Sequence, residues 1–111
     1  MFIFDVETLG VDSNAVILSA ALIHFDPTEK PNYQKLLDDA IFVKLKAKDQ
    51  IERLKRSVNV GTLEWWKNQH HYARSVSFDP SGDDLLAEDA ITLLHNYMNK
   101  FPNARNQTMW A

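Results

Sequence analysis

The chain of 111 residues contains no cysteine, which excludes a disulfide framework and thiolate metal sites. No apolar run approaches the roughly 20 residues of a membrane-spanning helix. The N-terminus also lacks the basic stretch of a signal peptide, since its apolar run meets an acid at Asp5. We therefore expect a cytoplasmic protein without membrane contact.

The chain also lacks an excess of basic residues, because its net charge is −3. Local sites and metal ions would have to attract any nucleic acid.

The residues that are present have the composition of an ordinary globular protein. Apolar residues make up 45% of the chain and charged residues 24%. This length allows one small domain with a modest core. Neither repeats nor a linker interrupts the sequence, so we expect residues 1–111 to form a single domain.

The apolar pattern predicts an α/β fold. Short connections between the first three expected strands favour an antiparallel meander. Residues 108–111 begin like a fourth strand, which should lie parallel to the first because the preceding helix acts as a crossover. A strand that stops just after it starts indicates the N-terminal part of a longer domain. The first three strands are expected at 2–7, 14–25 and 40–46.

Three helices are also expected. The charged segment at 47–57 is short, and the segment at 61–76 would begin with Thr62 as its N-cap. The clearest pattern lies at 83–101, and the prolines at 27 and 31 predict a loop over 26–32. One face of this last helix would carry Leu86, Ala90, Leu93, Leu94, Tyr97 and Phe101.

The first strand runs into two carboxylates, in the sequence Phe-Ile-Phe-Asp-Val-Glu-Thr-Leu-Gly at 2–10. Residues i and i+2 of a strand point to one face, so Asp5 and Glu7 project together while Val6 faces the core. Adjacent carboxylates repel each other and are costly to desolvate, and a hard cation such as Mg²⁺ or Mn²⁺ offsets that cost. A bare Asp-x-Glu is more often an acidic strand end. The apolar strand before it and the Thr-Leu-Gly after it favour a metal site here.

The stretch Phe-Asp-Val-Glu-Thr-Leu-Gly and the following Ser-Asn-Ala-Val-Ile-Leu-Ser resemble the first motif and second strand of DEDD-type 3′→5′ exonucleases. These enzymes have a ribonuclease H-like fold. Residues 62–74 resemble the Thr-x-x-Trp-Trp-x-x-Gln element, with Ala-Arg shortly after, of the branch that contains the phage exonuclease A proteins. The resemblance covers nearly the whole chain.

The resemblance implies that Asp5 and Glu7 are catalytic and hold two Mg²⁺ or Mn²⁺ ions. The implied substrate is the 3′ end of single-stranded DNA or RNA, from which nucleoside monophosphates are released. The phage branch also implies the cytoplasm of a host cell. The family's other two acids and its histidine base come from motifs that would follow Ala111, and none of the four histidines stands in that position. Residues 1–111 alone are therefore expected to be inactive.

Two other functions stay open. One is a catalytically inactive nucleic-acid-binding or interaction remnant of the same fold. The other is an endonuclease of the ribonuclease H type, against which the tryptophan element argues. Self-association with a second chain also stays open.

The candidate substrate-binding residues each have a structural alternative. Leu9 either wedges against the terminal base or folds onto the core, and Thr8 either donates to the substrate or caps the turn. Trp65 and Trp66 cannot share a helix face, so one could pack inside and the other lie nearer the surface, where it could stack on a base. The alternative is that both belong to the core, which is the more frequent outcome for aromatic residues on a helix. Gln69 binds substrate or caps a loop. The candidates are Val6, Thr8, Leu9, Trp66 and Gln69.

One segment concentrates basic residues. It either guides a single strand toward the site or forms a solvated helix face, since Asp49 and Glu52 dilute its charge. The basic residues are Lys44, Lys46, Lys48, Arg53, Lys55 and Arg56.

Overall fold

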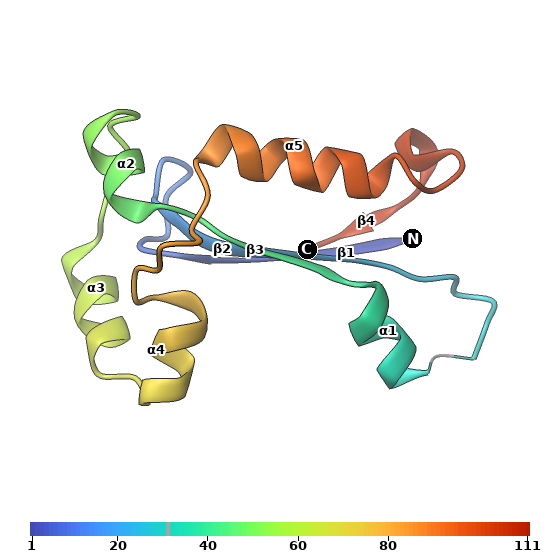
Figure 1. The fold of residues 1–111 in the computed structure, drawn as a ribbon, viewed down its shortest axis with the longest axis horizontal. Helices are drawn as coiled ribbons and strands as arrows, with labels where there is room; N and C mark the ends of the chain where they lie inside the picture. The colour runs from blue at the N-terminus through green and yellow to red at the C-terminus, as the bar shows by residue number, and fades with distance from the viewer. Residues whose placement is uncertain (31) are drawn as a thin grey trace.

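A computed structural model describes residues 1–30 and 32–111, and its centre is a four-stranded sheet in the order β3-β2-β1-β4 (Figure 1). Strand β1 pairs antiparallel with β2, and β2 pairs antiparallel with β3. Strand β4 pairs parallel with β1, through Phe2 and Ile3. The predicted meander and the parallel fourth strand are both confirmed. The strands are β1 (Phe2–Thr8), β2 (Ile17–His24), β3 (Ile41–Lys44) and β4 (Met109–Trp110).

The helices lie on both sides of this sheet. Helix α5 runs along one face, while α1 lies beyond the other face at one end of the sheet and α3 and α4 lie at the opposite end (Figure 1). No helix in the described part of the chain is long and apolar enough to cross a membrane. The helices are α1 (Tyr33–Asp39), α2 (Ala47–Glu52), α3 (Val60–Lys67), α4 (His71–Ser77) and α5 (Ala87–Met98), with a 3₁₀ turn at Ala104–Asn106.

The core divides where the pairing of β1 and β2 slips. Glu7 lies opposite Ser19, but Thr8 lies opposite Ile17, so Leu18 is an extra residue in β2. Ile17 packs with the cluster under α5, whereas Leu18 packs with Trp66 of α3. Such a bulge turns successive side chains away from strict alternation. Strand β2 therefore supplies apolar side chains to helices on both sides of the sheet.

The single helix expected at 61–76 is wrong, because the chain forms two. The N-cap of α3 is Asn59 rather than Thr62, and its side-chain oxygen accepts from the Thr62 N–H at 2.9 Å. Helix α4 starts after His70, whose Nδ1 accepts from the Tyr72 N–H at 3.2 Å. Two polar caps within twelve residues give the backbone a second place to start a helix.

The helix expected at 83–101 spans only Ala87–Met98. Its expected first turn is held by a buried ion pair, in which the Lys44 ammonium lies 2.9 Å from the Asp84 carboxylate. The same carboxylate accepts from the Ser81 N–H at 2.9 Å, which fixes the chain in a turn. Ala90 and Tyr97 are buried as expected, but Leu93 is 42% exposed.

Smaller deviations concern the ends of elements. Strand β2 starts at residue 17 rather than 14, β3 ends at 44 rather than 46, and α2 ends at 52 rather than 57. Helix α1 was not expected, and it begins after Asn32, whose side chain accepts from the Lys35 N–H at 3.2 Å. The expected loop at 26–32 includes Pro31, which lies outside the described residues.

A buried glutamine continues the sheet where β3 has ended. The Gln50 side-chain oxygen accepts from the Ile17 N–H at 2.9 Å, and its amide donates to the Ile17 carbonyl at 2.7 Å. Gln50 is fully buried in α2. The side chain thus replaces a neighbouring strand at the bulge and joins α2 to β2.

Replacing this amide should destabilise the fold strongly. In Gln50→Leu, both backbone groups of Ile17 lose their partner in a buried place, and we expect the free energy of unfolding to fall by about 2–4 kcal/mol. Urea unfolding followed by circular dichroism measures the change. The exposed Gln34→Leu is the matched control and should stay within about 0.5 kcal/mol of the wild type. Equal losses in the two variants would contradict the strand-like role of Gln50.

Candidate functional site

Asp5 and Glu7 lie on one face of β1, near the end where the strand leaves the sheet. Their partners in β2 are Ala21 and Ser19. Phe4, before Asp5, and Val6, between the two acids, point to the other face, where Phe4 packs with the cluster under α5. The Asp5 side chain is exposed and Glu7 is half-buried. The strand therefore presents two carboxylates side by side, as the sequence predicts.

The two carboxylates influence each other electrostatically. Partial burial raises the pKa of Glu7 above its ordinary value, and the negative charge of Asp5 raises it further. Among residues 1–30 and 32–111, no group of three or more His, Cys, Asp or Glu side chains could hold a metal ion. The described residues thus offer two oxygen ligands on one face, which suit a hard cation but do not complete its coordination.

The turn after Glu7 is closed by hydrogen bonds within the protein. The Thr8 hydroxyl donates to the Gly10 carbonyl at 2.6 Å. Leu9 is 3% exposed and belongs to the cluster with Trp66, so the core alternative holds for Leu9 and the wedge does not. The Leu9 carbonyl accepts from the Asn59 N–H at 2.7 Å. The geometry thus favours the turn cap of the two alternatives for Thr8.

The tryptophan pair divides between core and surface, which is the first of the two arrangements that the sequence left open. Trp66 is 5% exposed and its Nε1–H donates to the Thr8 carbonyl at 3.1 Å, so its ring offers no surface on which a base could stack. Trp65 is 55% exposed and meets Trp66 edge-to-face, with ring centroids 5.1 Å apart. The interpretation of Trp66 as a substrate contact is therefore corrected. Of these two neighbours, Trp65 has the accessible ring.

Two other candidates also lie differently from the expectation. Val6 was expected in the core but is 37% exposed, at a cavity of about 300 Å³ that it lines with Phe4 and Leu94. The Gln69 amide donates to the Trp65 carbonyl at 2.9 Å, which caps the end of α3. Of the two alternatives for Gln69, substrate binding and capping, the geometry favours capping.

Three of the six basic residues of this segment bind other parts of the protein. Lys44 pairs with Asp84, and Arg53 pairs with Asp49 and Glu88. Arg56 donates to the Ala15 carbonyl at 3.0 Å. This favours the structural alternative for the segment over a basic track for a single strand.

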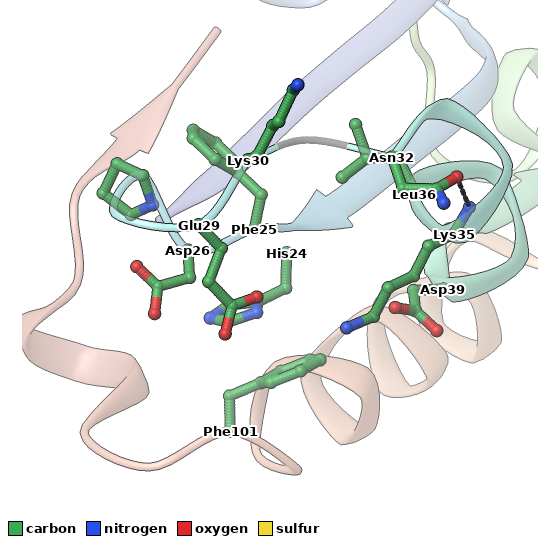
Figure 2. Close-up of a pocket in the computed structure, with 11 residues that line it drawn as sticks. His24, Phe25, Asp26, Glu29, Lys30, Asn32, Lys35, Leu36, Asp39 and Phe101 are labelled. Carbon is green, nitrogen blue, oxygen red and sulfur yellow. Dashed lines mark hydrogen bonds between the residues drawn. The ribbon is translucent and has the colours of Figure 1, made fainter.

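His24 lies away from the acidic pair in the fold. His24 faces Phe2 at the opposite end of the β1–β2 pair, stacks on Phe101 with centroids 3.8 Å apart and contacts the Gln107 oxygen. It lines a cavity of about 570 Å³ with Asp39 and Lys35, among others (Figure 2). His70 caps α4. The cavity in Figure 2 is therefore a different place from the acidic strand end.

Two residues near the strand end were missed by sequence reasoning. Asn59 holds the Leu9 carbonyl through its N–H and caps α3 through its side chain. Phe78 stacks on Trp66, with centroids 5.9 Å apart and planes at 9°. An Asn three residues before Thr62 is a recognisable N-cap signal. The stack of Phe78 on Trp66 joins residues of different segments, so no local sequence pattern predicts it.

Comparisons with known proteins identify the family of the chain. The family model of the 3′-5′ exoribonuclease Rv2179c-like domain matches residues 1–111. The chain belongs to this family. The exodeoxyribonuclease of Enterobacteria phage T4 is 34% identical over 100 residues, which are 88% of this chain and 43% of that relative. No solved structure matches the chain.

Membership of this family confirms the predicted 3′-5′ exonuclease resemblance and its phage branch. The mixed sheet with helices on both sides is the α/β, ribonuclease H-like arrangement that the resemblance implied. The chain spans less than half the length of the phage relative.

Neutralising Glu7 should stabilise the fold at neutral pH. Its pKa is higher in the folded than in the unfolded chain, so Glu7 stabilises most when protonated, and stability is lost as pH rises through the raised pKa. Without divalent ions, Glu7→Gln should therefore be more stable than the wild type at pH 7 and similar to it at pH 3. Thermal unfolding at both pH values measures this. Glu29→Gln, which removes a carboxylate from the exposed loop after β2, is the control for the loss of one charge, and the gain of Glu7→Gln at pH 7 should exceed its effect. A Glu7→Gln variant that loses stability at pH 7 contradicts the expectation.

Proposed function

We propose that this chain is the N-terminal part of a metal-dependent 3′→5′ exonuclease that releases nucleoside monophosphates. The observation that carries the proposal is the pair Asp5 and Glu7, side by side on one face at the end of β1. Repulsion between the two carboxylates lowers the stability of the fold. Such unfavourable charge pairs are typical of functional sites, where a bound cation can compensate for the repulsion.

In this proposal Asp5 and Glu7, both ionised, hold Mg²⁺ or Mn²⁺. Such ions, when bound, supply activation of the attacking water and stabilisation of the leaving oxygen. The half-buried Glu7 must lose its proton before it binds a cation, so its raised pKa makes binding weaken as the solution is acidified. The family's further acids and its histidine base would come from outside residues 1–111.

The exposed ring of Trp65 supports contact with a base. It lies next to Trp66, which contacts the strand end itself. Stacking on an aromatic side chain is worth about 1–3 kcal/mol per base and tolerates any sequence. We propose the 3′ end of a single strand as the substrate. The family description names an exoribonuclease and the phage relative is named an exodeoxyribonuclease, so both RNA and DNA belong in the test.

Nuclease assays with labelled oligonucleotides test the proposal. Residues 1–111 alone should cleave single-stranded DNA and RNA negligibly with Mg²⁺ or Mn²⁺, because two carboxylates cannot position two ions and provide no base. A longer protein that contains these residues and the family's later acidic and histidine motifs should shorten a 5′-labelled strand from its 3′ end. In that protein Asp5→Ala should abolish cleavage and leave the fold intact.

The control for this assay is Asp38→Ala, which removes an exposed carboxylate of α1 and should leave the rate unchanged. Cleavage inside a circular strand would indicate the endonuclease alternative. A longer protein that binds strands without cleaving them would indicate the inactive binding remnant. An active Asp5→Ala would overturn the proposed role of the pair.

Metal binding by the chain alone should be weak. Two carboxylates on a partly exposed strand leave most of a cation's ligand positions to water. Calorimetric titration with Mg²⁺ should show no tight binding to residues 1–111. Tight binding at two sites would contradict this expectation.

A further inference from the structure

The buried indole of Trp66 joins α3 to the residue that follows the acidic pair. Its Nε1–H donates to the Thr8 carbonyl at 3.1 Å. The ring is stacked on Phe78 and packed in the cluster of Leu9, Val16 and Leu18. A ring held on its faces by packing keeps its N–H in one direction. That direction is toward the end of β1.

The backbone after Glu7 has few other conformations open to it. Three successive carbonyls are bound: Thr8 by the indole at 3.1 Å, Leu9 by the Asn59 N–H at 2.7 Å and Gly10 by the Thr8 hydroxyl at 2.6 Å. A Cβ at Gly10 would lie 3.1 Å from the Ala15 Cβ, so the turn also lies tightly against the chain leading into β2.

The indole acts where the sheet itself gives least support. The pairing of β1 with β2 slips between Glu7 and Thr8, and the pairing with β4 reaches only to Ile3. A regular ladder would fix the peptide planes on both sides of Glu7. At this point the bond from Trp66 takes over part of that task.

We infer that Trp66 is a positioning residue, which holds the Thr8 backbone so that the Glu7 carboxylate stays beside Asp5 for a shared divalent cation. Two like charges favour separation, and the direction of a side chain follows its backbone. Groups that orient metal ligands through hydrogen bonds typically change metal affinity by about 10–100-fold when removed. The inference rests on the metal site proposed above.

Manganese titration of the ¹⁵N-labelled chain tests the inference. Mn²⁺ broadens the amide signals of residues near it, so the signals of residues 5–8 report an apparent Kd for the site even when binding is weak. Trp66→Phe keeps an aromatic ring against Phe78 but has no N–H, and it should raise this Kd about tenfold. Trp65→Phe is the same chemical change on the exposed neighbour and should leave the Kd unchanged.

Two further variants separate the hydrogen bond from packing. Phe78→Leu loosens the stack on Trp66 but keeps the N–H and its acceptor, so it should lower the unfolding temperature and raise the Kd less than Trp66→Phe does. Trp66→benzothienylalanine keeps the ring volume and replaces the N–H with sulfur, so it should raise the Kd as Trp66→Phe does. All titrations are made well below the unfolding temperature of each variant. The Trp66 indole proton should exchange slowly with solvent in the wild type.

The outcomes distinguish this inference from the proposed function. Broadening of residues 5–8 in the wild type, with the same Kd in both Trp66 variants, would overturn the positioning role and leave the metal site standing. A Kd raised equally by Phe78→Leu would assign the effect to packing and overturn it as well. No broadening at residues 5–8 in the wild type, or broadening that persists in Asp5→Asn with Glu7→Gln, would overturn the metal site itself and the inference with it.

Discussion

The slip in pairing between Glu7 and Thr8 is the constraint on which the rest of the molecule depends. One extra residue in β2 lets Ile17 face the α5 side while Leu18 faces Trp66. Without the slip, strict alternation would put Leu18 on the face of Ala20 and Leu22, under α5, and away from Trp66 of α3. Side chains bind the backbone groups that have no strand partner at this end, because β3 ends at Lys44 and the pairing with β4 reaches only Ile3. Gln50 binds those of Ile17 and Trp66 binds the carbonyl of Thr8.

Both of these side chains come from helices that follow β3, so the sheet and the helices at this end depend on one another. Gln50 is held in α2, and Trp66 in α3. An unpaired buried backbone group typically costs about 1–3 kcal/mol, so each helix stabilises the bulge as much as the bulge positions the helix. The carboxylates of Asp5 and Glu7 lie next to this rigid region, which is where a metal site gains most from fixed ligands.

Sequence reasoning found the strands and the acidic pair because both follow a local period. The alternation in β1 placed Asp5 and Glu7 on one face, and the parallel β4 followed from the crossover rule. It failed where distant residues decide the outcome. The helix expected to start at 83 starts at Ala87 because Asp84 pairs with Lys44, some 40 positions earlier in the chain. The burial of Trp66 likewise depends on its stack with Phe78, and the burial of Leu9 on its cluster with Val16. No local sequence pattern predicts either contact.

The same dependence explains why the residues around the acidic pair serve structure first. The Thr8 hydroxyl, the Leu9 side chain, the Trp66 indole and the Gln69 amide all have partners inside the protein. A substrate would then meet the carboxylates, the exposed ring of Trp65 and backbone, rather than a row of free side chains. Recognition through backbone and an aromatic face carries little sequence information. An enzyme that must remove any nucleotide from a strand end needs that tolerance, so a firmly packed motif with few free side chains suits the proposed exonuclease better than a sequence-reading protein.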